Sequence, residues 1–414
     1  MQTVIAEDGT KHVFALMLGV LGVAGLGIYW SLRFAIADGF EARSNLSASA
    51  HAIALVSGDE EYLRRAGELT EEAGGDGTAY YRRAAAVDPF AANDWMQLGF
   101  HAERSGRYQE AERDLLKAAS VDQSFEPRWT LANFYFRRDD SSNTLRWIRK
   151  SLSIAEGDFT AVFRLCWQAT GDPGQILREA MPNRPGVLGQ YLNFLFSTNR
   201  FEESTAIAMR LVGIASPDQT GALLDYCDRA LTAAHPDQAA TVWNALSRRG
   251  LIPQSGIGGN LAHTIRNRDF HAALTGRGFD WKSSAPEGVL IDSAGSEGLR
   301  IEFSGKQGDE SVILSQYVHL TPETRYVFNT RYQSEGIAPG AGLRWRLLNP
   351  FTGREVENAA VELPSANSEQ AQAKFIVPPY LRWGLLRLLY NRRPGTNRIE
   401  GSLRLIFVDI AAEK

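Results

Sequence analysis

A repeat of 34 residues is the feature that most constrains how this chain can fold. Segment 81–89 aligns with segment 115–123 at that offset, and Trp95, Trp129 and Phe163 recur at the same interval. Each unit is expected to be a pair of helices with a narrow apolar stripe. One pair cannot bury this stripe alone, so neighbouring pairs must stack. The sequence therefore predicts an α-solenoid of helix pairs.

The best-preserved unit resembles the tetratricopeptide repeat (TPR) family. The family pattern combines a tryptophan, a Leu-Gly pair and spaced alanines, and it is matched by Trp95, Leu98, Gly99, Ala111, Leu115 and Ala118, with Trp129 opening the next unit. Ala102 and Gln123 stand where the family has Tyr and Pro. The match is strongest over 78–152 and degenerate to about 250, and the Gly/Pro cluster at 171–174 predicts a bend or a lost helix. The resemblance implies a concave face that binds a peptide or protein partner, with no catalytic residues.

The N-terminal stretch 13–32 contains no charged residue and is flanked by Lys11 and Arg33. As an α-helix it would rise about 30 Å, which is the hydrocarbon thickness of a bilayer. Tyr29 and Trp30 lie where an interfacial aromatic belt belongs. The sequence therefore predicts a single transmembrane helix.

Two alternatives to the anchor are a cleaved signal peptide and a buried core helix. Ala35-Ile36-Ala37 offers a small-x-small cleavage site, but the apolar run is longer than a usual signal and the site lies beyond Arg33. A core helix would need a polar face to interrupt the run. The charges near the two ends, Lys11 against Arg33 and Arg43, slightly favour a cytoplasmic C-terminal side, but long domains translocate largely regardless of charge. The C-terminal region indicates an exported protein, so we expect the bulk of the chain to be periplasmic or extracytoplasmic.

The helical pattern stops near residue 250, and beyond a Gly/Pro/Ser-rich stretch the apolar period becomes two. Alternation predicts strands at 299–303, 312–320, 324–332, 343–347 and 403–407, and the mixed apolar run 383–390 fits a buried strand better than a helix. We therefore expect a multidomain α plus β protein with four parts: 1–37 with the transmembrane helix at about 13–32, 38–250 with TPR-like repeats, a linker at 251–266, and an antiparallel β-sandwich at 267–414.

The C-terminal region resembles the galactose-binding-like jelly rolls, specifically carbohydrate-binding modules. The resemblance rests on segments 267–270 and 278–281 as an opening strand, 315–326 as a hairpin, and 403–410 as a closing strand. It implies a domain that binds glycan. Many such modules hold a structural calcium between acidic residues of the first and last strands. Asp409 matches the second position, but His271 stands at the first, so no metal is assigned.

Strand alternation also places arginines of this region on faces. Arg344 and Arg346 share one side of their strand, Arg331 projects from a polar side of another, and Arg387 interrupts an apolar face. If these strands are neighbours, the four guanidinium groups line one polar face. Guanidinium groups grip carboxylates and phosphates and stack on rings, so the face would suit an anionic polysaccharide. The alternative is an ordinary solvated sheet face.

Composition and motifs exclude several classes of protein. The formal net charge of −4 gives no reason to expect a nucleic-acid partner. Cys166 and Cys227 fall in helical patterns and are expected in helix cores, not in a disulfide or a metal site. The sequence has no Gly-rich phosphate loop, no Gly-x-Ser-x-Gly elbow and no histidines at metal-ligand spacing. We therefore expect a non-enzymatic protein without a cofactor.

Two functions fit these features. The first is a membrane-anchored accessory protein of cell-envelope polysaccharide production or export. Its repeats would bind a protein partner, and its sandwich would bind a glycan. The second is a purely structural scaffold that joins proteins and binds no glycan.

Overall fold

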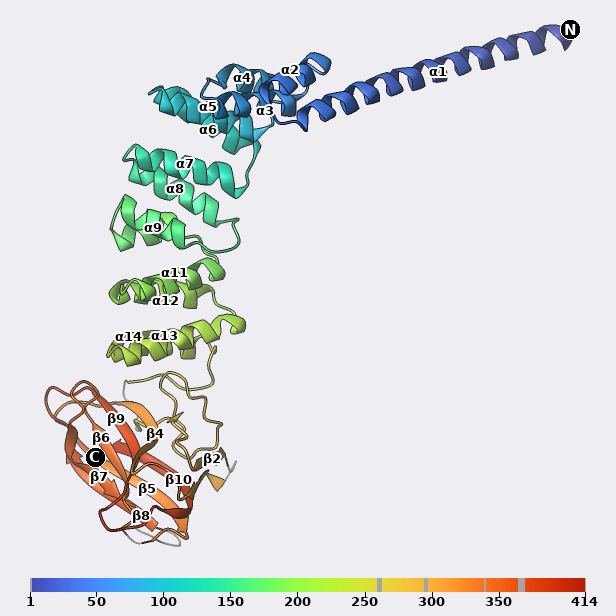
Figure 1. Ribbon diagram of the computed structural model, residues 1–414. Coiled ribbons are helices and arrows are strands. Elements are labelled where there is room, and N and C mark those ends of the chain that lie inside the picture. Colours follow the sequence, from blue (N-terminus) through green and yellow to red (C-terminus); the bar gives the residue numbers. More distant parts are fainter. Residues whose placement is uncertain (1, 259–262, 294–296, 339, 364–368, 414) are drawn as a thin grey trace. The chain divides into compact units, whose positions relative to one another are not determined.

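The chain is a multidomain α plus β protein, as the sequence predicts, with an apolar N-terminal helix, paired helices and two antiparallel sheets (Figure 1). It divides into two compact units, residues 1–182 and 183–414. The computed structural model describes these residues: 2–258, 263–293, 297–338, 340–363 and 369–413. Residues 259–262 of the expected linker lie outside this set.

The first unit is helical. Its elements are α1 (Gln2–Glu41), α2 (Leu46–Leu55), α3 (Glu60–Glu72), α4 (Thr78–Val87), α5 (Ala92–Arg104), α6 (Tyr108–Val121), α7 (Phe125–Arg137), α8 (Ser141–Leu152), α9 (Thr160–Ala169), α10 (Pro173–Gln175) and the π-helical turn η1 (Ile176–Ala180).

Close approach of the two helices in a pair depends on a glycine at one position. A Cβ on Gly99 of α5 would lie 2.6 Å from the Leu115 side chain of α6. The preceding pair repeats the arrangement, since a Cβ on Gly67 of α3 would lie 2.8 Å from the Tyr81 ring of α4. Ala111, Leu115 and Ala118 are all fully buried behind these contacts. Small residues therefore set the spacing within each pair, and large ones fill the space that remains.

The two repeat tryptophans lie at the edge of this core and are half-buried. Trp95 packs beside Tyr81 and Leu98, and its indole N–H donates to the Pro89 carbonyl oxygen at 3.0 Å. Trp129 stacks on Phe125, with 5.9 Å between ring centroids. Trp95 thus joins its helix pair to the preceding loop, whereas Trp129 packs on the first turn of its own helix.

The array loses a full-length second helix after α9, where the Gly/Pro cluster lies. Only the three residues of α10 and the π-helical turn η1 follow it. Pro173 begins α10, and Asp172 caps it by accepting hydrogen bonds from the Gly174 and Gln175 amides. The boundary between the two compact units falls just beyond, at residues 182 and 183.

The second unit contains two more helix pairs and the sandwich. Its helices are α11 (Pro185–Ser197), α12 (Phe201–Ile214), the 3₁₀ turn η2 (Pro217–Gln219), α13 (Thr220–Thr232) and α14 (Pro236–Arg248). Its strands are β1 (Lys282–Ser283), β2 (Val289–Ser293), β3 (Leu299–Ser304), β4 (Glu310–His319), β5 (Arg325–Glu335), β6 (Leu343–Leu348), β7 (Glu355–Glu362), β8 (Glu369–Ile376), β9 (Trp383–Asn391) and β10 (Glu400–Ala412).

Two five-stranded antiparallel sheets pack face to face. Sheet A has the order β1-β4-β9-β6-β7, and sheet B has the order β2-β3-β10-β5-β8. Both contribute to one apolar core that is rich in aromatic rings. Trp281 and Trp345 are fully buried there, with 5.6 Å between their ring centroids, and Phe328 of sheet B contacts Trp345 of sheet A edge to face.

The opening strand expected at 267–270 and 278–281 does not form. Asn267 and Phe270 have φ values of 44° and 58°, which are left-handed and incompatible with an extended strand. The Asn267 side chain closes a turn with Ala272, and the Trp281 indole donates to the Asn267 carbonyl oxygen. These contacts hold the segment as an irregular loop, and the first strand, β1, begins only at Lys282.

Candidate functional site

The four arginines expected on one face are divided between the two sheets. Arg344 and Arg346 lie on β6 and Arg387 on the neighbouring β9, where Arg346 and Arg387 are direct cross-strand partners. Arg331 lies on β5 in sheet B. The expectation of a four-arginine face is therefore wrong, because alternation assigns a residue to a side of its strand and does not choose the sheet.

Glutamates of the edge strand β7 already neutralise part of the sheet A arginine trio, Arg344, Arg346 and Arg387. The Arg346 guanidinium pairs with Glu355, and Arg344 lies 4.0 Å from Glu362. Arg387 has no ion pair among the described residues. The Nε atoms of Arg344 and Arg387 are shielded from solvent and lack a hydrogen-bond partner within that set. The trio is thus a half-buried, partly compensated surface with one uncompensated cation.

The last helix pair covers the other half of the same sheet face. The Tyr317 hydroxyl of β4 donates to the Leu231 carbonyl oxygen of α13 at 3.1 Å. The Trp383 indole of β9 donates to Asp237 of α14 at 2.8 Å. Burial lowers the pKa of the adjacent His319. A ligand on sheet A is therefore limited to the half that carries the arginine trio.

An ionic cluster and an aromatic stack hold this junction together. Asp228 of α13 accepts from Arg277 Nε at 2.7 Å, from Lys282 Nζ at 2.7 Å and from the Gly278 amide at 2.8 Å. Beside it, the fully buried Phe279 lies between Trp243 of α14 and Trp383 of β9, at centroid distances of 5.7 and 5.4 Å. A Cβ on Gly278 would lie 2.4 Å from the Trp243 ring, so this approach requires glycine.

Sheet B carries a polar hollow of about 400 Å³ on its outer side. Arg404 of β10 is the direct partner of Arg300 on β3 and of Gln333 on β5, which brings two guanidinium groups side by side. Glu302 pairs with Arg300 at 2.8 Å, and Glu297 pairs with Arg404 at 2.6 Å. The hollow is lined by Arg300, Gln333, Ser334, Glu335, Ser402 and Arg404.

Sequence reasoning missed this hollow, although the signal was present. Leu299–Ser304 and the start of β10 both alternate, so Arg300 and Arg404 had to project away from the core. Arg331 lies further along the same sheet. It is exposed, and its guanidinium lies 5.6 Å from the Phe407 ring centroid, which Arg268 also approaches at 5.5 Å. One arginine of sheet B and one from the loop before β1 therefore approach an aromatic ring outside the hollow.

Asp409, the residue that matches the calcium position of the resembled modules, has cationic neighbours. Its Oδ2 lies 2.7 Å from His263 Nδ1 and 3.8 Å from Arg268 Nη1. Burial raises the pKa of Asp409, and the His263 and Arg268 charges oppose that shift. His271 is exposed and lies 3.4 Å from Asp269. Across the described ranges, no group of three or more acidic, His or Cys side chains could hold a metal.

In the first unit, the first helices of successive pairs are joined by polar side chains. Glu71 of α3 contacts His101 and Arg104 of α5. Arg137 of α7 pairs with Glu103 of α5 through two hydrogen bonds of 2.7 Å. Other polar side chains of α5 take no part in these ion pairs and are exposed to solvent, including Asn93.

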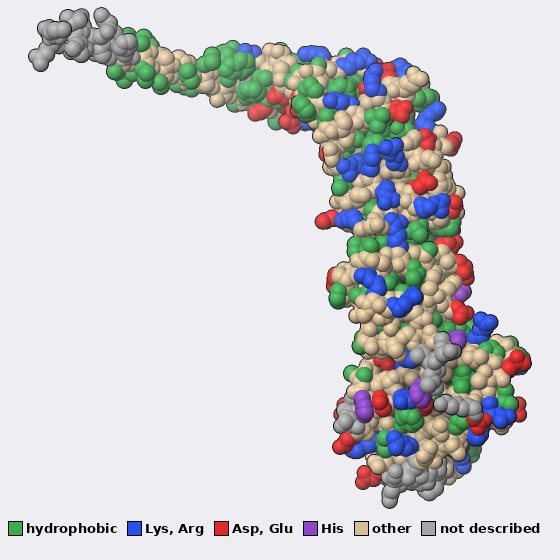
Figure 2. All heavy atoms as spheres, turned by 180° about the vertical axis from the view of Figure 1, so that it is seen from behind, with side chains coloured by type: hydrophobic (Ala, Val, Ile, Leu, Met, Phe, Trp, Pro, Cys, Tyr) green, Lys and Arg blue, Asp and Glu red, His purple; other side chains and the backbone are tan. Residues whose placement is uncertain are grey.

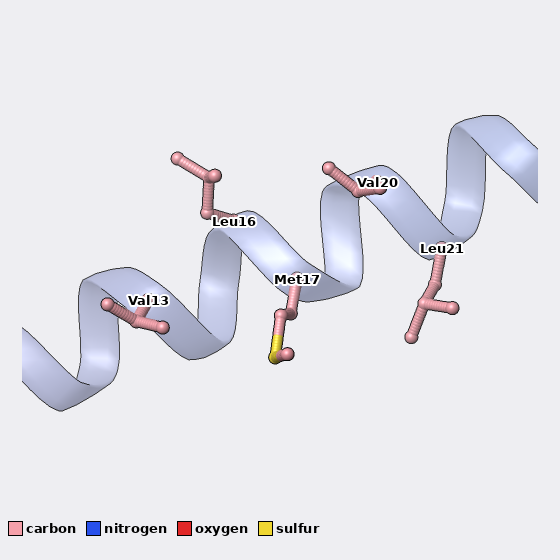
Figure 3. Close-up of a pocket in the computed structure, with 5 residues that line it drawn as sticks. All are labelled: Val13, Leu16, Met17, Val20 and Leu21. Atoms are coloured by element: carbon pink, nitrogen blue, oxygen red, sulfur yellow. The ribbon is translucent and has the colours of Figure 1, made fainter.

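The long helix α1 has an exposed apolar part and a C-terminal part that packs on other helices. Val13, Leu16, Met17, Val20 and Leu21 project from α1 with no other element near them (Figure 3), and each is more than 60% exposed. Figure 2 shows this apolar surface in green along the helix. By length and composition α1 could cross a membrane, and a signal sequence would meet the same test.

The C-terminal part of α1, from Arg33 to Glu41, packs against the first helix cluster. Ala37 is fully buried against Ala52, Val56 and Tyr62. The Arg33 guanidinium donates to the Leu55 carbonyl oxygen, and the Tyr62 hydroxyl donates to Asp38. Residues 33–41 are therefore part of the repeat array.

Comparisons with known proteins find partial structural similarities at low sequence identity. No protein-family model and no curated protein matches the chain. A CBM4 structure is 11% identical and covers 36% of this chain and 100% of its own, with a TM-score of 0.29. MamA is 14% identical over 42% of this chain and 97% of its own, with a TM-score of 0.33. YrrB, a TPR protein with an unusual peptide-binding site, is 17% identical over 42% of this chain and 96% of its own, with a TM-score of 0.27.

Proposed function

We propose that this protein is a membrane-anchored, non-enzymatic adaptor of the cell envelope. Its helix pairs recruit a protein partner, and its sandwich contacts an anionic polysaccharide during polysaccharide production or export. The bulk of the chain lies on the periplasmic or extracytoplasmic side. The observation that carries the anchor is the burial of Ala37 in the first helix cluster, because cleavage at Ala35-Ile36-Ala37 would remove Arg33 and Ala37 from a packed core.

Membrane extraction tests the anchor. The full chain is expected to stay in membranes after carbonate washing, since stretch 13–32 is long enough to span the bilayer. A chain starting at Arg33 keeps the buried contacts of α1 and is expected to be released. Sequencing the N-terminus of the protein from cells completes the test. A mature N-terminus at Asp38 would overturn the anchor.

Recruitment of a protein partner is supported by the polar row on the first helices. A photo-crosslinking residue at Asn93 or Gln97 of α5 is expected to capture a discrete partner in cells. The matched control is Ser120 on α6, which is exposed on a second helix. Equal capture from Ser120 and Asn93 would contradict a partner site on the first helices.

Glycan binding is supported by the arginines on the outer faces of both sheets. Calorimetric titration of the detergent-solubilised chain with a uronic-acid-rich glycan compares two double variants. One changes Arg344 and Arg346 to Ala, and the other changes Arg300 and Arg404 to Ala. Loss of binding in one variant locates the site, and binding is expected to weaken with added salt.

The pairing of Arg344 and Arg346 with glutamates of β7 favours the second candidate, a purely structural scaffold. Under that function, the wild-type chain binds no envelope glycan in the same titration, while crosslinking from Asn93 persists.

A further inference from the structure

In the first unit, the end of the proposed membrane-crossing stretch lies beside the C-terminal end of α2. Arg33, immediately after the apolar run, donates to the carbonyl oxygen of Leu55, the last residue of α2. Helix α1 continues without a break from the apolar run to Glu41. The C-terminal end of α2 therefore lies beside the point at which α1 leaves the array.

Further contacts join the first helices of the following pairs to α1 and to one another. Tyr62, in the first turn of α3, donates to Asp38 of α1. Arg64 of α3 lies 3.9 Å from Asp94, in the first turn of α5. Because consecutive helices are antiparallel, the loops between pairs lie at the edge of the array that carries the contact between Arg33 and Leu55. The loop between α4 and α5 belongs to this edge.

That loop has a backbone held by hydrogen bonds, and it exposes a large aromatic side chain. Phe90 is 76% exposed, and Val87 beside it is 44% exposed. The Phe90 amide donates to Asp88 Oδ1 at 2.8 Å, and the Trp95 indole holds the neighbouring Pro89 carbonyl oxygen. Helix α4, which leads into the loop, contains Arg82 and Arg83 and no acidic residue. Both arginines are exposed.

We propose that this edge of the array rests on the bilayer surface and that Phe90 inserts into the lipid interface. The proposal rests on the proposed membrane anchor. An aromatic side chain is favoured at the headgroup level, and anionic lipid attracts arginines such as those on the helix that leads to it. The contacts from Arg33 to Asp94 leave the array no flexible linker by which to turn this edge away from the membrane.

Site-specific fluorescence of the full chain in lipid nanodiscs tests the proposal. Both native cysteines are buried, so an environment-sensitive label reacts selectively with one introduced exposed cysteine. Phe90→Cys carries the label on the proposed membrane edge. Ser105→Cys is the matched control, because Ser105 is exposed in the turn between α5 and α6 at the opposite edge.

The label at position 90 is expected to show blue-shifted emission and strong quenching by nitroxide-bearing lipid, and the label at position 105 to show neither. In discs with anionic lipid, changing Arg82 and Arg83 to Ser in the Phe90→Cys chain should reduce that quenching. Equal quenching at the two positions, or a fully aqueous label at position 90, would overturn the proposal. A failed anchor is distinguishable, because the chain then does not enter nanodiscs.

Discussion

The two ends of the helical array are covered by different kinds of side-chain contact. At the N-terminal end, residues 33–41 of α1 pack on α2 and α3 through small side chains, with Ala37 and Ala52 at the centre of the contact. At the C-terminal end, the loop that leads into the sandwich places Phe279 against Trp243 of α14. In a repeat stack each pair contacts only its neighbours, so an uncovered terminal pair would expose its apolar face.

This difference indicates how each attachment works. An alanine contact buries little area but allows two helices to run close together, which suits an anchor that must stay continuous with the fold. An aromatic and ionic contact buries more apolar surface and fixes geometry, which suits a separate domain joined to the last pair. The C-terminal junction should therefore dominate the stability of its pair, whereas the N-terminal contact should tolerate little added volume.

The largest expected effect comes from removing the aromatic stack of the C-terminal junction. Phe279→Ala should cost about 3–5 kcal/mol, the usual range for a fully buried aromatic residue. Hydrogen exchange should then rise in α13, α14 and β9 together. Phe328→Ala is the matched control, since it removes an equally buried ring from the sandwich core. If the control raises exchange in α14 as much as Phe279→Ala does, the junction is not a distinct contact.

Asp94 is a buried acidic residue within the array, away from its two covered ends, and it makes stability depend on pH. Burial first, and the neighbouring Glu60 carboxyl second, raise the pKa of Asp94 to about 8, and Arg64 opposes this shift. The folded state then keeps a proton that the unfolded chain releases near pH 4. Stability should therefore fall as pH rises from about 4 to 8 and level off above that range.

Asp94→Asn should remove this slope and protect α3 and α5 from exchange at pH 8 by roughly 1–3 kcal/mol relative to the wild type. At pH 4 the two proteins should be similar. Glu60→Gln is the paired control and should flatten the slope only in part. A wild-type protein with the same stability at pH 5 and pH 8 would contradict a buried, protonated Asp94.

Much of the array could be predicted from local sequence, because its contacts are local. The spacing of Gly99, Ala111 and Leu115 encodes how one helix approaches the next, and the structure places all three in close contact. The shortened pair after α9 also carries its own signal in the Gly/Pro cluster. Each of these features depends on residues within one or two helices of the repeat.

The sandwich was less predictable because its contacts are distant in sequence. Alternation placed Arg344 and Arg346 on one side of a strand, but it could not show that β5 pairs with β8 and β10 instead of β6. The junction was equally hidden, since Asp228 and Arg277 are separated by 49 positions. Asn267 and Phe270 adopt left-handed conformations that local propensity does not indicate.

A smaller effect should follow from removing the ionic part of the C-terminal junction. Asp228→Ala leaves Arg277, Lys282 and the Gly278 amide without their shared acceptor, and should cost about 2 kcal/mol. The control is Asp225→Ala. Asp225 contacts the same Arg277, but its side chain is 64% exposed, so its loss should stay within about 0.5 kcal/mol. Similar costs for the two variants, measured by exchange in α13, would show that Asp228 is not the centre of the cluster.

An effect of similar size, confined to fewer residues, is expected at the N-terminal end of the array. Ala37→Leu adds volume to a fully buried position between Ala52 and Tyr62, and overpacking of this kind costs about 1–3 kcal/mol. Exchange should rise in α2 and in the first turn of α3, while membrane retention stays unchanged because stretch 13–32 is intact. Ala35→Leu is the matched control, since Ala35 is exposed one half-turn earlier on the same helix. If both variants leave α2 equally protected, Ala37 is not packed into the array, and the argument against cleavage after it loses its physical basis.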